Sequence, residues 1–137
     1  MKKWVVVSCL ILTVMLSSVK AKIIADNDKD VKRIADPIMD NILEGMKIES
    51  YEIYPKDFDK TMKRALDEKA FLLTNSKIED RIGNYQSRIF LGFLNQDDFT
   101  VILYKGKFNG TKNDVLMKLV LDKKKQDKIE VSGLWFQ

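Results

Sequence analysis

Four stretches in the second half of the chain decide the fold: YQSRIFLGFL at residues 85–94, FTVILYKGKF at 99–108, DVLMKLVLD at 114–122 and KIEVSGLWF at 128–136. Each is rich in β-branched, aromatic and other apolar residues, which favours strands. The segments between them are short and polar, so successive strands are expected to pair as hairpins. The sequence therefore predicts a four-stranded antiparallel meander.

The residues before these strands follow a helical period instead. Apolar residues at three- and four-residue spacing predict a long amphipathic helix over 26–49, in which Pro37 predicts either a kink or a later start. Further helices are predicted after Pro55 and over 68–82, where Gly83 is a C-terminal stop. Helices followed by strands predict an α+β fold, with the N-terminal helices packed on the sheet.

Glycines inside three of the predicted strands indicate that the sheet is curved. They are Gly92, Gly106 and Gly133. Glycine in a strand interior usually marks a bulge or a sharp bend. A curved sheet wrapped around a long helix leaves a conical pocket at its open end. The candidates for the pocket mouth are Tyr51, Tyr54, Asp57 and Phe58, and we expect the tyrosine rings to plug this mouth rather than to form a ligand-binding wall.

The first twenty-one residues have the layout of a secretory signal peptide. Lys2 and Lys3 precede an apolar run, and small residues then allow cleavage between Ala21 and Lys22. The alternative is an uncleaved membrane anchor, but the run is shorter than the ~20 residues that a spanning helix needs. We therefore expect a secreted or periplasmic protein that contacts the membrane only through this segment, with a single α+β domain over residues 22–137.

Cys9 raises the alternative of lipid attachment, because Val6-Val7-Ser8-Cys9 resembles a lipoprotein acylation box. Only a few apolar residues precede this cysteine, and a long apolar run follows it. We interpret Cys9 as part of the apolar region of the signal, which is removed with it.

Composition excludes several classes of function. The chain carries 24 basic and 20 acidic residues, and loss of the lysines in the signal lowers the formal net charge from +4 to +1. A persistent basic surface for nucleic acid is therefore not expected. There is no histidine, and the single cysteine lies in the signal, so we expect no cofactor and no zinc, copper or haem site. A serine or threonine nucleophile has no histidine to act as its base.

The exported part resembles small bacterial domains of unknown function with the nuclear-transport-factor-two-like, or cystatin-like, fold. The residues that carry the resemblance are Ile34-Ala35-Asp36 to Gly45-Met46, Phe58 to Met62, Ile82-Gly83-Asn84-Tyr85 and Val131-Ser132-Gly133-Leu134-Trp135. It covers residues 30–137 and speaks for the fold more than for an activity. The superfamily includes an isomerase that uses Asp and Tyr side chains, so Asp57 or Asp59 with a tyrosine is an alternative acid–base site. A solvated helix face explains these carboxylates better.

The alternating positions of the strands are apolar on both sides, which is not typical of a sheet with one wet face. Since the helices can cover only one face, the other exposes apolar side chains. We expect a partner there: a second copy in a homodimer or another exported protein. The interface candidates are Phe90, Ile102, Tyr104, Leu116, Val120, Leu134 and Phe136. The predicted function is a non-enzymatic exported binding module, and the alternative is a carrier of a small apolar ligand.

Overall fold

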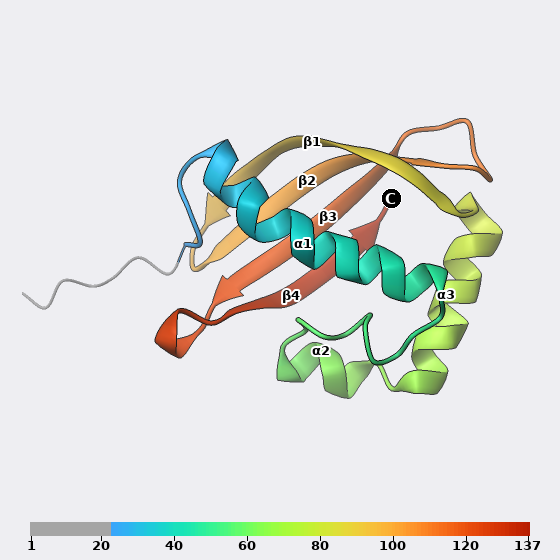
Figure 1. Cartoon of the computed structure of the whole chain (residues 1–137), viewed down its shortest axis with the longest axis horizontal. Helices are drawn as coiled ribbons and strands as arrows, with labels where there is room; N and C mark the ends of the chain where they lie inside the picture. Colours follow the sequence, from blue (N-terminus) through green and yellow to red (C-terminus); the bar gives the residue numbers. More distant parts are fainter. Residues whose placement is uncertain (1–22) are drawn as a thin grey trace, which may run out of the picture.

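The computed structural model describes residues 23–137, so the predicted signal, its cleavage site between Ala21 and Lys22, and Cys9 lie outside the described residues. The sheet has four strands, and the chain forms one long and two shorter α-helices. The long helix lies across the sheet, with the shorter ones beside it (Figure 1). The elements are α1 (Asp28–Lys47), α2 (Lys60–Ala65), α3 (Glu68–Ile82), β1 (Tyr85–Gln96), β2 (Phe99–Phe108), β3 (Val115–Lys123), the 3-10 turn η1 (Lys125–Asp127) and β4 (Ile129–Phe136). No helix within residues 23–137 combines the length and the apolar run that crossing a bilayer requires.

The four strands form one sheet in the order β1-β2-β3-β4, and each adjacent pair is antiparallel. This confirms the predicted meander and the α+β fold class. Because the connections are short, each strand pairs with its neighbour in sequence. The strand bounds differ by no more than two residues from those predicted.

Side-chain caps begin the three α-helices. Asn27, Asp59 and Asp67 each accept a hydrogen bond from the backbone N–H three residues further on. α3 ends at Gly83, whose φ of 79° suits glycine. α1 runs through Pro37 as one helix, so the predicted alternative of a later start is wrong.

The segment before α2 is held against the free edge of β4. Phe58 forms a parallel bridge with Val131, the Asp59 N–H donates to the Val131 carbonyl at 2.9 Å, and the Val131 N–H donates to the Asp57 carbonyl at 2.7 Å. Because these bonds need extended backbone, α2 begins at Lys60 rather than directly after Pro55.

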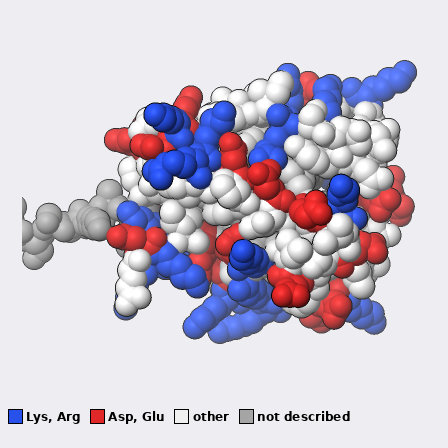
Figure 2. Space-filling model, viewed as in Figure 1, with Lys and Arg blue, Asp and Glu red and all other residues white. Residues whose placement is uncertain are grey.

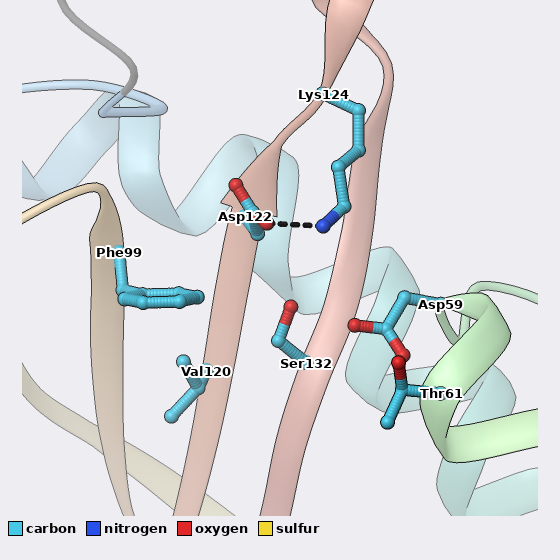
Figure 3. Close-up of a pocket in the computed structure, with 7 residues that line it drawn as sticks. All are labelled: Asp59, Thr61, Phe99, Val120, Asp122, Lys124 and Ser132. Atoms are coloured by element: carbon cyan, nitrogen blue, oxygen red, sulfur yellow. Dashed lines mark hydrogen bonds and ion pairs between the residues drawn. The ribbon is translucent and has the colours of Figure 1, made fainter.

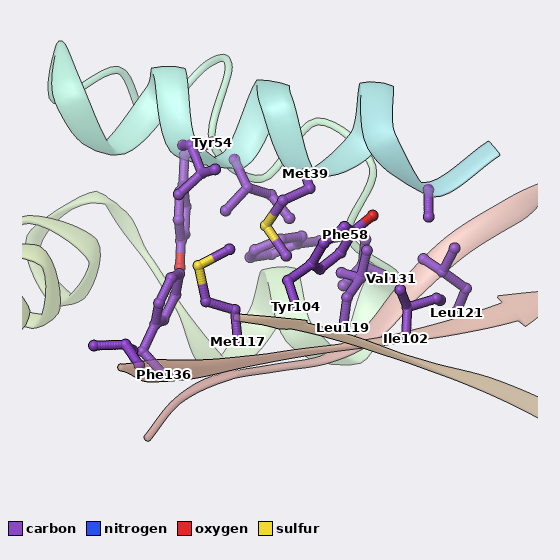
Figure 4. Packing of buried hydrophobic residues seen from close by; sticks show 14 of the residues in the cluster. Met39, Tyr54, Phe58, Ile102, Tyr104, Met117, Leu119, Leu121, Val131 and Phe136 are labelled. Atoms are coloured by element: carbon purple, nitrogen blue, oxygen red, sulfur yellow. The ribbon is translucent and has the colours of Figure 1, made fainter. Parts of the chain in front are cut away.

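The core lies between α1 and the sheet. Val31, Ala35, Met39 and Ile42 recur at three- and four-residue spacing on α1 and are fully buried. They pack against side chains from the middle of the sheet and against Tyr54 and Phe58, which fill the space between helix and strands (Figure 4). Burial of this stripe positions α1 and gives the sheet one covered face.

β-Bulges interrupt the register at two of the three predicted glycines. The β1–β2 ladder shifts between Phe90 and Gly92, and the β3–β4 ladder shifts where Val131 and Gly133 oppose consecutive residues of β3. Gly106 lies in regular pairing, where an added Cβ would approach the Met117 Sδ to 2.7 Å. Each bulge reverses which alternate side chains of its strand face the helix.

The predicted interface set is corrected by this register. We call the sheet face turned away from α1 the outer face. Leu116 and Val120 lie on it, whereas five of the predicted residues face α1 and join or border the core: Phe90, Ile102, Tyr104, Leu134 and Phe136. Both sets of alternating side chains in β2 are apolar, so the sequence does not indicate which set faces the helix. In β1 and β4 the bulges change which alternate residues face it.

Candidate interaction surface

The outer face can be read directly from the strand pairing, because residues opposite each other in antiparallel strands point to the same side. Apart from a marginal pair, Ser87 and Lys107, it forms four rows that cross the sheet from β1 towards β4. The first is Gln96, Phe99, Asp122 and Glu130; the second is Leu94, Val101, Val120 and Gly133; the third is Gly92, Leu103, Lys118 and Trp135; the fourth is Ile89, Lys105 and Leu116. The two middle rows are mostly apolar, and charged side chains lie at the two ends.

Large apolar side chains on this face stay in contact with solvent. Ile89, Leu94, Phe99 and Trp135 are 58, 49, 38 and 43% exposed. Since free side chains of this kind present on the order of 200 Å² each, the four expose roughly 400 Å². Half-buried leucines and valines of the second to fourth rows lie between them. A patch of about 300–600 Å² is the largest that a typical monomer shows, and such patches are often functional.

The Trp135 ring lies between Lys118 of the third row and Gly133 of the second. The Lys118 Nζ lies 4.4 Å from the centroid of its ring, a cation–π contact. Gly133 makes room for the ring, because a Cβ there would lie 2.3 Å from Trp135 ring atoms. The indole is therefore held on the surface as a broad apolar platform.

A hollow of about 330 Å³ opens at the first-row end, between the outer face and α2 (Figure 3). Its lining residues are Asp59, Thr61, Phe99, Val120, Asp122, Lys124 and Ser132. Phe99 and Val120 form an apolar wall, and the Asp59 carboxylate faces them from the N-cap of α2, where its Oδ1 also accepts a hydrogen bond from the Met62 N–H at 2.8 Å.

Charges in this hollow do not balance. The Lys124 ammonium binds the Asp122 carboxylate, and this hydrogen bond raises the pKa of Lys124 above its ordinary value. Asp59 adds a second carboxylate without a second lysine among the lining residues. The Ser132 Oγ is buried and has no hydrogen-bond partner, which costs free energy unless a polar group reaches it. The hollow therefore offers two carboxylates and one ammonium, with the buried Ser132 hydroxyl in its wall.

The predicted pocket-mouth residues lie elsewhere. Tyr54 and Phe58 are buried in the core, where the Tyr54 ring packs on Phe58 and Phe71. The Tyr51 hydroxyl donates to the Leu66 carbonyl at 2.7 Å. These residues fill the space between helix and sheet, and none of them lines the hollow on the outer face.

Asp57, the fourth pocket-mouth candidate, contacts α1: its Oδ2 accepts a hydrogen bond from the Asn41 Nδ2 at 3.4 Å. Its backbone carbonyl belongs to the bridge with β4. Neither Asp57 nor Asp59 forms a hydrogen bond with a tyrosine hydroxyl within residues 23–137. The acid–base pair that the sequence offered as an alternative is therefore not assembled.

A polar cluster that the sequence analysis missed joins α1 to β1 and β2. The Arg88 guanidinium, only 15% exposed, lies 2.7 Å from the Asp40 Oδ1, and the Tyr104 hydroxyl donates to the Asp36 Oδ1 at 2.8 Å. Burial lowers the pKa of Arg88, but hydrogen bonds to Asp40 and Tyr85 outweigh it and raise that pKa overall. Burial, and then the bond to Asp36, raise the pKa of the Tyr104 hydroxyl.

This cluster holds the helix in place rather than forming a reactive centre, because its charged and hydroxyl groups bind one another. The sequence signal was an arginine among the apolar residues of a strand, with aspartates four apart on the facing helix. The α1 side of the molecule carries charges of both signs, interspersed over the surface (Figure 2). Within the described part of the chain, no three acidic or cysteine side chains gather in a way that could hold a metal ion.

Comparison with known proteins gives one match. A family model described as "Protein of unknown function (DUF3887)" matches residues 40–129, from the middle of α1 to the start of β4. No curated protein and no solved structure matches. The match confirms the predicted resemblance to a domain of unknown function. The nuclear-transport-factor-two-like fold is compatible with the observed arrangement and stays a prediction.

Proposed function

We propose a binding function, rather than a catalytic one, for this chain, which belongs to the DUF3887 family of proteins of unknown function. It is an exported module that associates with a second copy of itself through the outer face of its sheet. The observation that carries the proposal is the exposed apolar surface of Ile89, Leu94, Phe99 and Trp135, on the face that α1 leaves uncovered.

The size of the surface supports association. Roughly 400 Å² from each of two copies, at about 25 cal/mol per Å², gives on the order of 20 kcal/mol before costs. Association costs an estimated 4–15 kcal/mol or more, so the balance favours binding. A stable interface buries about 800 Å² per partner, which the exposed patch and its half-buried neighbours together can approach.

A substitution in the second row tests the proposal. The exported protein should be dimeric by sedimentation equilibrium at micromolar concentration, and Leu94→Lys should raise the dimer Kd at least about tenfold, because it puts a charge in an apolar interface. The matched control is Leu73→Lys on α3: Leu73 is 55% exposed but lies outside the sheet. A wild-type protein that stays monomeric at 100 micromolar, on the order of the highest useful concentration, would sink the proposal.

Export is supported by the first twenty-one residues, whose basic start, apolar run and small residues before Lys22 suit a signal peptidase. The recovered protein should begin at Lys22, which an intact mass measurement decides. A protein that keeps Met1 and stays in the cytosol contradicts this part of the proposal without affecting the dimer test.

A further inference from the structure

We infer that the two copies stack about a two-fold axis that runs across their strands, and that the hollow of each copy receives the Lys105 side chain of the other. This inference rests on the proposed self-association and adds its geometry. The group that binds in the hollow is a primary ammonium on an alkyl chain.

The outer face is electrically polar along the strands. Its first row ends in Asp122 and Glu130, which pair with Lys124 and Lys128, and Asp59 in the hollow adds an extra negative charge. The fourth row carries Lys105, whose charge helps to lower the pKa of Asp114. The ion pair of Asp114 is with Lys107, and Lys105 forms none with any of residues 23–137. The third row adds a further positive charge on Lys118, which lies over Trp135 rather than beside a carboxylate. The first-row end of the face therefore carries an excess negative charge, and the fourth-row end carries an excess positive charge.

A two-fold axis that lies between two stacked sheets can run in either of two directions. An axis along the strands places each row over the same row of the second copy, so that acidic ends meet and lysine ends meet. An axis across the strands, between the second and third rows, places the first row over the fourth. Like charges in an interface are strongly unfavourable and opposite charges set the register, so the second arrangement is selected.

The hollow can accommodate both the alkyl stem and the ammonium group of a lysine side chain. The wall of Phe99 and Val120 can pack the alkyl stem, as lysine stems commonly do on apolar surface. The ammonium brings three hydrogen-bond donors to a site with the carboxylates of Asp59 and Asp122. The second copy thus supplies the positive charge that the hollow of the isolated chain lacks.

Charge reversal at the two ends tests the arrangement. Lys105→Glu and Asp122→Lys should each raise the dimer Kd at least about tenfold, because like charges then meet at two symmetric contacts. An equimolar mixture of the two variants should form a heterodimer, since each contact again joins opposite charges. Lys112→Glu makes the same charge change in an exposed turn off the face and should leave the Kd unchanged.

Zero-length carbodiimide cross-linking of wild-type protein gives a second readout that needs no substitution. With one copy labelled in nitrogen-15, mass spectrometry should find Lys105 joined to Asp59 or Asp122 of the other copy. The inference is overturned if neither cross-link forms, if single charge reversals leave the Kd unchanged, or if the mixture does not associate. When these outcomes accompany a dimer that Leu94→Lys disrupts, the orientation is wrong and the proposed function stands. A wild-type monomer overturns both.

Discussion

Removal of one buried hydroxyl should change how the stability of this protein responds to alkaline pH. Tyr54 is 6% exposed, and burial raises the pKa of its hydroxyl to about 12. Its hydroxyl forms no hydrogen bond with the described residues. We therefore expect Tyr54→Phe to change the free energy of unfolding at pH 7 by less than about 1 kcal/mol, the net worth of a typical hydrogen bond.

The pH dependence follows from the difference between the folded and unfolded pKa values of Tyr54. An unfolded tyrosine titrates near pH 10, about two units lower, so the unfolded state loses its proton first as pH rises. The stability tied to this hydroxyl is fully present below pH 10 and is lost between about pH 10 and 12. At pH 11 the wild type should have lost about 1.4 kcal/mol that Tyr54→Phe retains.

Urea unfolding followed by far-UV circular dichroism at several pH values from 7 to 11 measures this difference. All other ionisable side chains are the same in both proteins, so the difference isolates Tyr54. Leu73→Ala has no titratable side chain at the changed position and should follow the wild-type profile. If Tyr54→Phe and the wild type differ by the same amount at pH 7 and pH 11, the reasoning about burial is refuted.

Three other substitutions test how the fold is held. Tyr104→Phe should cost about 1.5–3 kcal/mol in urea unfolding at pH 7, because it removes a hydrogen bond to the Asp36 carboxylate. Gly45→Ala gains about 1 kcal/mol of helix propensity. Its Cβ would lie 2.5 Å from the Tyr54 backbone N, so we expect a net loss of about 1–3 kcal/mol, and a stabilised variant would contradict this close approach. Arg88→Met should lower stability by about 1–2 kcal/mol, less than the 3–5 kcal/mol of a fully buried pair, because its aspartate partners on α1 reach water. A loss outside that range in thermal or urea unfolding would revise the role of the cluster.

Elements set by local signals were predictable. α3 spans the predicted residues because Asp67 caps its start and Gly83 ends it, and both signals lie directly beside the helix in the sequence. β2 was predicted at its observed bounds because its apolar residues end at polar turns. α2 was predicted to begin too early, because the bridge between Phe58 and Val131 is a contact between distant parts of the chain.

The candidate surface was predicted in kind but not in detail. The idea of an apolar outer face came from a sheet that is apolar on both sides, yet Ile102 and Tyr104 face the helix. When both faces of a strand are apolar, the sequence does not indicate which face packs on the helix. In β4, the extra residue at the Ser132 bulge also reverses which alternate residues after it face the helix. The link from Arg88 to Asp40 escaped notice because a single sequence carries no record of which distant residues meet.

The bond pair between Val131 and residues 57 and 59 has a consequence for misassembly. It saturates the backbone in the middle of β4, so an incoming strand from another molecule cannot dock there. β1, at the opposite margin, has no such cover among the described residues. Fibril growth by edge-to-edge strand pairing needs two unpaired sheet edges on every molecule. With the β4 edge covered at Val131, such addition stops after a single pairing through β1, which protects a chain with no disulfide from continued polymerisation.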